Sequence, residues 1–387
     1  MATLILMAGI GALTQSVFVP SMSGMATWFG VDYKVMQIAI SGYLATTAVA
    51  QLVIGPLSDR FGRRPVVIFG LVLFLIGTLG AILAPNATVF LLFRMLQSGV
   101  AAALVLSRAI VRDMVPEREA AAMIGYVTMC MAAIPMAGPM IGGALDTVFG
   151  WRASFVLLFV SGMALLVLCI LDQGETAPLK GGGLRQQMRS YPLLLGSGRF
   201  WGYALVAAFG SAGFPILTAG ASFIAHSIFG LSSFQAGIGL GVPALGYAAG
   251  NFLSGRMTMR FGIDRMIITG LIVAMGSVTF ALAFALAGDR HPLIFYGALV
   301  IQGLGIGMLL PSATAGLLSV RPELAGTASG LGAALMMACG AVAAALSGFF
   351  LDAERGAAPL LLMVLVVNAF AWAGLSIATR DRRRFGL

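Results

Sequence analysis

One arginine lies inside an apolar run, where its chemistry would be that of an anion-binding group. The segment VFLLFRMLQSGVAAA, residues 89–103, contains Arg94 with no acidic residue one helical turn away on either side. A charge near the middle of a membrane helix costs about 2.5–3.5 kcal/mol on insertion scales. We expect Arg94 to face a central cavity and to attract a carboxylate, phenolate or similar acceptor of a substrate. The alternative is a side chain that snorkels to the nearer membrane surface.

Other polar and aromatic side chains are candidates for the same cavity. Small-molecule sites are mostly apolar, with a few polar groups that orient the ligand. Phe214, in the second half of the chain, is predicted to form part of an aromatic wall of the cavity. The alternative is a side chain that faces lipid. The predicted substrate-binding residues are Arg94, Gln97, Ser16, Gln37, Tyr43, Tyr126, Phe214 and Asn251.

A charged turn, GPLSDRFGRRP at residues 55–65, has the composition of an electrostatic latch. Asp59 is the acid of this turn, and an acid that faces a helix N-terminus gains about 0.3–1 kcal/mol from the helix dipole. Arg63 or Arg64 is expected to pair with Asp113, at the inner end of a later helix, so that the contacts hold one side shut and break in the other state. The predicted gate residues are Gly55, Asp59, Arg60, Gly62, Arg63, Arg64, Arg112 and Asp113.

The composition places these residues in a helical membrane protein. Of 387 residues, 59% are hydrophobic and only 10% are charged, whereas an average soluble domain carries about 25% charged residues. Apolar runs long enough to cross a core of about 30 Å recur along the whole chain. The predicted spans are 3–27, 35–58, 66–84, 89–113, 121–145, 152–172, 199–226, 233–257, 264–287, 292–317, 324–350 and 357–379.

The chain carries a net charge of +9, and its basic residues are distributed unevenly between the predicted loops. Most basic residues fall in one set of alternate loops, which the positive-inside rule makes cytoplasmic, together with both termini. The charge therefore indicates topology and contact with anionic lipids, and nucleic acid is not expected as a partner. A basic, glycine-rich connection divides the predicted domains: 1–172, a six-helix bundle; 173–198, a cytoplasmic linker; 199–387, a second bundle.

Enzymatic chemistry is not expected. The chain contains no GxSxG and no HExxH, and its only histidines are His226 and His291, so a catalytic triad or a metal site lacks its groups and no cofactor is implied. A channel is less consistent with two repeated halves, because LSDRFGRRP after the second span is echoed by LSGRMTMRFGIDR after the eighth. Internal repeats of this kind are typical of secondary transporters, and we expect a monomer.

The charged turn resembles the signature loop of the major facilitator superfamily, with every signature position filled. Arg94, Gln97 and Gly99 resemble the fourth-span pattern of that family. AGPMIGG, residues 137–143, resembles the fifth-span pattern of its exporters; there Gly138, Pro139, Gly142 and Gly143 form a helix-bend motif that permits close helix contact.

RAIVRDM at 108–114, the turn at Pro20, GWRASF and AGTASGL narrow the resemblance to the Bcr/CflA drug-resistance exporters. The resemblance implies two pseudo-symmetric six-helix bundles in a bacterial inner membrane. It also implies alternating access and the export of small amphipathic drugs or metabolites against proton entry.

The chain departs from that subfamily at one position that bears on proton coupling. Ser16 stands where its members usually carry an intramembrane aspartate, and all fourteen acidic residues lie at span ends or in loops. Asp113 and His226 are the remaining candidate proton sites, His226 because histidine titrates near physiological pH. The alternative function is a proton-independent facilitator, or an importer of a small anionic solute or a metal chelate.

Overall fold

The computed structural model describes residues 2–114, 134, 137–176, 192–288, 291–321, 324–351 and 356–384. The described residues are nearly all helical, and eleven of their helical stretches are long and apolar enough to cross a membrane. The predicted fifth span, 121–145, lies mostly outside the described residues, although 137–149 are helical. The predicted all-α membrane class is confirmed.

The helices of the first half follow the predicted spans within a few residues. They are α1 (Ala2–Ser16), η1 (Val19–Ser21), α2 (Met22–Phe29), α3 (Tyr33–Met36), α4 (Ile38–Phe61), α5 (Arg63–Leu83), α6 (Ala87–Leu96), η2 (Gln97–Val100), α7 (Ala101–Met114), the stretch 137–149, and α9 (Arg152–Asp172).

The second half repeats this pattern. Its helices are α11 (Gly198–Ser211), α12 (Gly213–Phe223), η3 (Ile224–Ile228), α13 (Ser233–Gly241), α14 (Pro243–Phe261), α15 (Ile263–Leu286), α16 (Pro292–Leu318), α17 (Ala325–Ser347), η5 (Gly348–Phe350) and α18 (Ala358–Arg384).

Prolines interrupt several spans. Pro20 lies in the 3-10 turn between α1 and α2, Pro215 follows the break between α11 and α12, and Pro243 opens α14. Proline has no backbone N–H and clashes with the preceding helical turn, so it bends or breaks a helix at these positions. The breaks leave carbonyl groups of spans one and seven available to side chains.

The sequence similarity between the two halves extends to the backbone conformation of the turns at Gly62 and Gly262. Gly62 and Gly262 end α4 and α14 with nearly the same geometry, φ 94° and ψ 155° against φ 85° and ψ 162°. Only glycine adopts such a conformation readily. The Arg60 guanidinium lies 5.1 Å from the Phe61 ring, and that of Arg260 lies 5.6 Å from the Phe261 ring. The same turn is therefore built twice.

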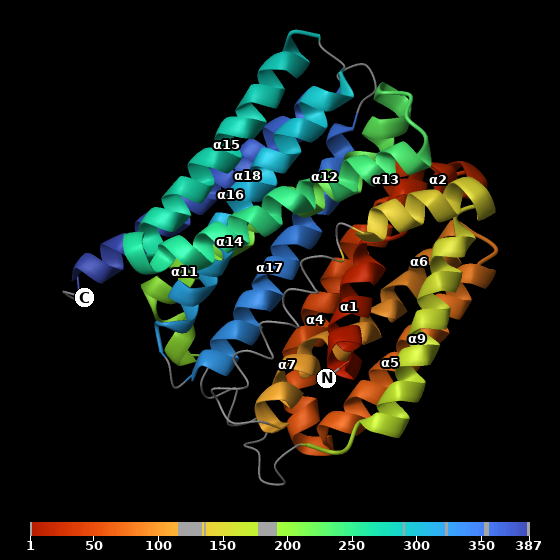
Figure 1. Ribbon diagram of the computed structural model, residues 1–387, viewed down its shortest axis with the longest axis horizontal. Coiled ribbons are helices and arrows are strands. Elements are labelled where there is room, and N and C mark those ends of the chain that lie inside the picture. Colours follow the sequence, from red (N-terminus) through yellow and green to blue (C-terminus); the bar gives the residue numbers. More distant parts are fainter. Residues whose placement is uncertain are drawn as a thin grey trace.

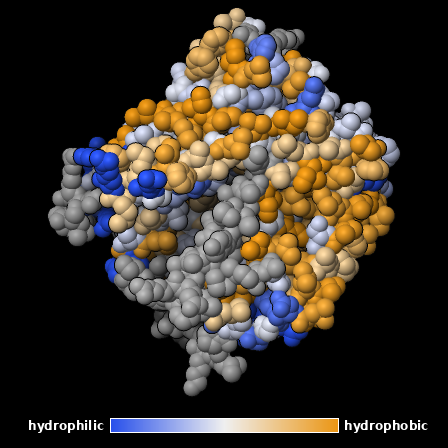
Figure 2. All heavy atoms as spheres, in the orientation of Figure 1, coloured by the Kyte–Doolittle hydropathy of each residue, from blue (hydrophilic) through white to orange (hydrophobic). Residues whose placement is uncertain are grey.

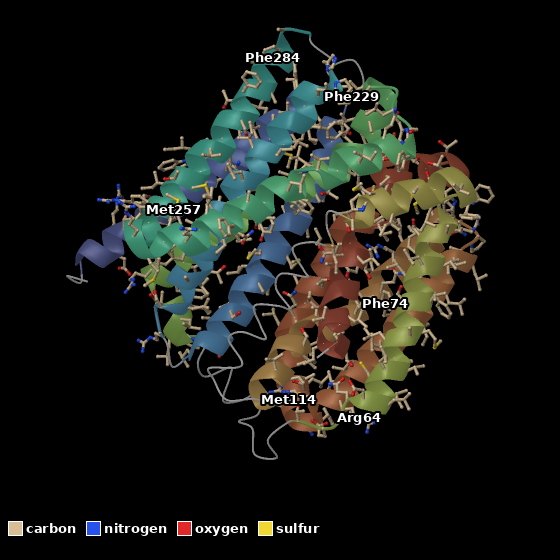
Figure 3. The ribbon with its side chains drawn as sticks, in the orientation of Figure 1. Arg64, Phe74, Met114, Phe229, Met257 and Phe284 are labelled. Atoms are coloured by element: carbon tan, nitrogen blue, oxygen red, sulfur yellow. The ribbon has the colours of Figure 1, made fainter. Side chains whose placement is uncertain are left out.

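Two groups of helices meet at one end of the molecule and diverge toward the other (Figure 1). α2, α12 and α13 come together at the end that carries Pro20, and α17 packs along α4 across the boundary. Arg64 and Met114 lie at the opposite end, and Phe229 lies near the first (Figure 3). We call these the Pro20 end and the Arg63 end. Apolar side chains dominate the visible face, and hydrophilic ones gather at its margins (Figure 2), as expected for helices in a bilayer.

Candidate functional site

The Arg94 guanidinium is buried inside the first half, and only 1% of the residue is exposed. Its Nε donates to the Ala39 carbonyl of α4 at 3.2 Å, and Nη2 donates to the Thr14 carbonyl of α1 at 2.8 Å. Nη1 donates to Oε1 of Gln97 at 2.5 Å. The guanidinium thus links three spans, and it does not snorkel to the surface.

Two aromatic rings and a second amide contact complete this arrangement. The Arg94 guanidinium lies 4.4 Å from the ring centre of Phe18 and 4.2 Å from that of Tyr43. Nε2 of Gln97 donates to the Thr78 hydroxyl of α5 at 2.8 Å. None of these partners is negatively charged, so the positive charge of Arg94 is solvated by dipoles and ring faces without being neutralised.

The other predicted binding residues lie in different surroundings. Ser16, Gln37 and Tyr43 are buried, whereas Phe214 is 44% exposed on α12 and Asn251 is half-buried on α14. Gln97 and Tyr43 contact Arg94, as expected. Gln37 instead donates to a carbonyl of the second half, and Tyr126 lies outside the described residues. The structure therefore brings three of the set together, and their role in binding stays a prediction.

The charged turn forms a network centred on Arg63, at the Arg63 end. Its Nη1 lies 2.6 Å from Oδ1 of Asp59 and its Nε lies 3.1 Å from Oδ2 of Asp113. Nη1 also donates to the Ser58 hydroxyl at 2.5 Å. Of the two partners expected for Asp113, Arg63 and Arg64, the structure shows Arg63, and this pair joins the end of α7 to the turn between α4 and α5.

Glu175 is a member of this network that the sequence analysis did not identify. Its carboxylate accepts from the backbone N–H groups of Arg63 at 2.8 Å and Arg64 at 3.2 Å, which are the first two residues of α5. An acid at this position satisfies unpaired N–H groups and the helix dipole together. Arg64 donates to the Ile170 carbonyl at 2.7 Å. Arg60 is exposed, and the side chain of Arg112 lies outside the described part of the chain.

Replacing Asp113 by asparagine is expected to weaken this network, because Arg63 loses one of its two carboxylates. The pair is largely buried, with 8% of the Arg63 side chain and 13% of the Asp113 side chain exposed. A hydrogen bond to a charged group is worth about 1.5–3 kcal/mol, so the unfolding temperature of the purified protein should fall measurably. Asp32→Asn removes the same charge from an exposed helix cap and serves as the control. Equal stability of the two variants would contradict the network.

The Pro20 end carries hydrogen bonds between the two halves. The Ser222 hydroxyl of α12 donates to the Pro20 carbonyl at 3.0 Å, lies 3.0 Å from the Ser23 hydroxyl, and accepts from the Ser23 N–H at 3.1 Å. The Tyr33 hydroxyl and the Gln37 amide both donate to the Ala219 carbonyl, at 2.8 and 3.1 Å. We call this set the clasp.

His226 lies beside the clasp, with Nε2 3.4 Å from the Pro20 carbonyl. The hydrogen bonds of the clasp and of this histidine join described residues of the two halves at the Pro20 end. At the Arg63 end, the bonds of Arg63 and Arg64 remain within the first half and the adjoining Glu175. The two ends are therefore held in different ways.

The helix-bend motif lies between α1 and the second half. A Cβ atom on Gly138 would lie close to the Ser16 hydroxyl, and one on Gly142 would overlap the Val17 carbonyl. On the other side, a Cβ on Gly143 would meet the Ser233 carbonyl, and the Pro139 carbonyl lies against Gly237 of α13. The small residues thus permit close approach to both neighbours, as the spacing predicts.

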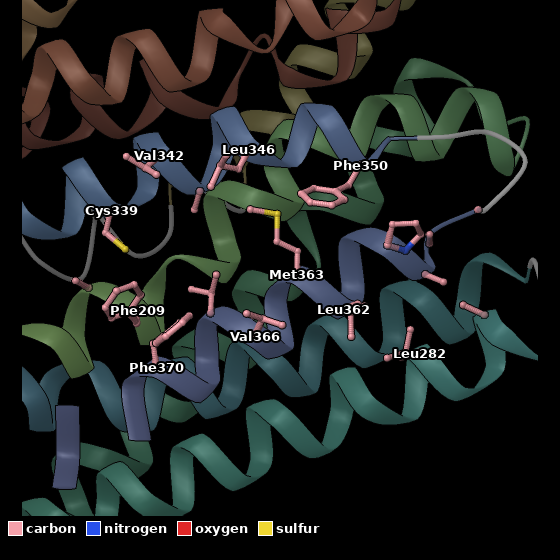
Figure 4. A pocket seen from close by; sticks show the side chains of 18 of the residues that line it. Phe209, Leu282, Cys339, Val342, Leu346, Phe350, Leu362, Met363, Val366 and Phe370 are labelled. Atoms are coloured by element: carbon pink, nitrogen blue, oxygen red, sulfur yellow. The ribbon is translucent and has the colours of Figure 1, made fainter. Parts of the chain in front are cut away.

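A cavity of about 1320 Å³ lies within the second half, between α17 and α18. Val342 and Leu346 of α17 and Leu362 and Val366 of α18 point into it (Figure 4). Its lining is apolar, and it includes none of the predicted polar binding residues. This cavity suits hydrocarbon chains and is separate from the surroundings of Arg94.

Comparison with known proteins agrees with this architecture. The sequence profile of the Major Facilitator Superfamily matches residues 4–344 and 217–384. The chain is 29% identical over 385 residues to multidrug resistance protein D of Escherichia coli, covering 97% of this chain and 95% of the relative. It is 34% identical over 294 residues to the multidrug transporter MdfA of Shigella boydii, covering 72% and 68%.

Solved structures share the fold at low sequence identity. A bacterial homologue of the human lysosomal transporter Spinster superposes with a TM-score of 0.76 at 16% identity, covering 99% of this chain and 96% of that chain. The xylose transporter XylE of E. coli gives a TM-score of 0.74 at 12% identity, covering 96% of each chain. These likenesses extend over the whole two-half arrangement.

Proposed function

The chain belongs to the major facilitator superfamily, and we propose that it exports small amphipathic drugs or metabolites by alternating access, driven by proton entry. It is a multi-pass membrane transporter and not an enzyme. Relatives named for multidrug resistance and multidrug transport, together with the exporter-type helix-bend motif, support the export of drugs.

The difference between the two ends is the observation that carries the proposal. Six hydrogen-bond contacts join described residues of the two halves at the Pro20 end, where Gly143 also touches the Ser233 carbonyl. A transporter that rocks two halves about a central site is expected to be closed at one end and free to part at the other. The positive-inside rule makes the Arg63 end cytoplasmic, with both termini, so this state faces inward in a bacterial inner membrane.

The chemistry near Arg94 supports an anionic or zwitterionic group on the solute. Its charge has no acidic partner among the described contacts, and an unneutralised charge in a low-dielectric interior acts over a longer distance than one in water. Phe214 and Asn251 would supply an aromatic surface and a polar contact from the second half. Together these residues favour solutes with one polar end and one apolar end.

Proton coupling would depend on groups other than the usual aspartate, because Ser16 stands in its place. Asp113, bound to Arg63, and His226, beside the clasp, are the candidate proton sites. The absence of any acid from the middle of a predicted span favours a second candidate function, a proton-independent facilitator.

Flux into proteoliposomes tests the choice between these functions. Protein would be reconstituted with a fluorescent lipophilic anion or zwitterion, and uptake measured with and without a pH gradient of one unit. Export coupled to protons predicts uptake that exceeds equilibration only when the gradient is present. Saturable uptake that ignores the gradient would support the facilitator, and a substrate-independent current would overturn both.

A further inference from the structure

Two amide side chains are buried in the second half without hydrogen-bond partners among the described residues. Gln302 of α16 is 2% exposed, and its Nε2 is unpaired; Asn368 of α18 is 1% exposed, and both Nδ2 and Oδ1 are unpaired. Both residues lie within membrane spans, where polar groups find no bulk water. Unsatisfied amides are strongly disfavoured there, so a partner of some kind is required.

Gln302 lies at the break between α11 and α12, and Asn368 lies near it on α18. Nε2 of Gln302 is 2.7 Å from the position that a Cβ atom on Gly213 would occupy, and Cγ1 of Val364 is 3.1 Å from it. Asn368 lies one turn beyond Val364 on the same buried face of α18. Phe370, two residues further, contacts Phe209 of α11 with ring centres 5.4 Å apart. Asn368 therefore lies about one helical turn along α18 from the residue that contacts the break.

The break supplies hydrogen-bond acceptors. Because Pro215 has no N–H, the Ser211 carbonyl four residues earlier loses its usual helical donor. The neighbouring bonds are long: the Ala212 N–H reaches the Phe209 carbonyl at 3.3 Å, and the Ile216 N–H reaches the Ala212 carbonyl at 3.3 Å. Amide donors and backbone acceptors thus lie within about one helical turn of the break.

We propose that this region is a water-binding site, formed by Gln302, Asn368 and the Ser211 carbonyl. A buried water molecule makes about three hydrogen bonds to otherwise unsatisfied groups. Water accepts from Gln302 Nε2 or Asn368 Nδ2, and it donates to Asn368 Oδ1 and the Ser211 carbonyl. The first half differs, because Gln97 of span four is fully paired with Arg94 and Thr78. In the first half the Arg94 guanidinium pairs with the buried amide, and in the second half water would pair with the buried amides.

The site makes the break a hinge for α12. That helix carries Ala219 and Ser222, the residues through which the second half enters the clasp. Water in a proline-interrupted helix re-satisfies freed backbone groups and can exchange its bonds as the helix bends. α12 can therefore move away from the first half while α11 stays packed on α18. This role rests on the proposed alternating access, whereas the water site does not.

Hydrogen–deuterium exchange of the full chain in lipid nanodiscs tests the site without any substrate. In the native protein, amides at 212–216 should exchange faster than those in the middle of α16. In the double variant Gln302→Leu/Asn368→Leu, exchange at 212–216 should slow by about tenfold or more, because the hydrated opening is closed. Gln51→Leu, which changes another buried amide with an unpaired Oε1 in the first half, should leave it unchanged.

Transport by the same variants tests the hinge. We expect the rate to fall about fivefold or more in the double variant, with Asn368→Leu alone showing the same direction if the double variant does not fold. Unchanged exchange in a folded variant would overturn the water site. Slowed exchange with an unchanged transport rate would overturn the hinge. Neither result would contradict the proposed transport function.

Discussion

Replacing Arg94 by methionine is expected to slow transport severely while leaving the protein folded. The buried guanidinium has no counter-charge among its contacts, so keeping it there costs stability that an apolar side chain of similar length would restore. Removing it orphans only Gln97 Oε1 among the side-chain groups that it contacts. We expect a rate loss of about 100-fold, equivalent to about 2.7 kcal/mol, and an unfolding temperature that is unchanged or raised.

Two further arginine variants make this result interpretable. Arg94→Lys keeps the charge and should retain part of the activity. Arg152 also lies over aromatic rings, Trp28 and Trp151, and donates to the Ile82 carbonyl, but it lies at a helix end. Arg152→Met should therefore transport almost normally. If Arg94→Met transports at the native rate, the guanidinium has no part in substrate handling; if it unfolds, its role is structural.

Replacing Gly142 by alanine is the second large effect that we expect. A Cβ atom there would overlap the backbone carbonyl of Val17, which cannot swing aside as a flexible side chain could. The helix over 137–149 would have to move away from α1, and its contacts with Ser233 and Gly237 of the second half would change with it. Overpacking of this kind costs about 1–3 kcal/mol, so we expect a lower unfolding temperature and a transport rate reduced about tenfold.

Gly276→Ala is the matched control for Gly142→Ala. Gly276 lies in α15 with open space where a Cβ would stand, and replacing a helical glycine by alanine there should stabilise the protein by up to about 1 kcal/mol. Opposite signs for the two variants in thermal unfolding would show that the close approach, and not helix propensity, decides the outcome. A Gly142→Ala protein as stable and active as the Gly276→Ala protein would contradict the packing.

The membrane spans could be read from the sequence because they depend on local composition. A hydrocarbon core requires a continuous apolar run, and the sixth span was predicted at the observed bounds, Arg152–Asp172. The charged turn was recognised because Gly62 and the acids and bases around it have fixed spacing. Placing these residues at the same membrane surface predicts that Arg63 or Arg64 pairs with Asp113, and the structure selects Arg63.

The sequence could not show which carbonyl groups accept from Arg94. Thr14 and Ala39 contribute backbone atoms only, and backbone acceptors carry no signal in the identity of a side chain. The clasp was missed for the same reason, since Ser222 and Tyr33 bond to carbonyls of the opposite half. The sequence therefore predicts Gln37 as a substrate-binding residue, whereas the structure places its amide in the clasp. Glu175 had no local signal either, because it follows α9 and lies 112 residues along the chain from Arg63, the start of the helix that it caps.

A disulfide across the clasp tests the central claim, that the halves must part at the Pro20 end during each cycle. Ser23→Cys and Ser222→Cys would be combined in a chain whose Cys130, Cys169 and Cys339 are alanine. The two hydroxyl oxygens lie 3.0 Å apart, so thiols there can reach the bond length of about 2.05 Å with a small adjustment. We predict that oxidation stops transport and that reduction restores it, whereas each single-cysteine variant ignores both treatments. Transport that continues at the native rate with the disulfide fully formed would contradict the account.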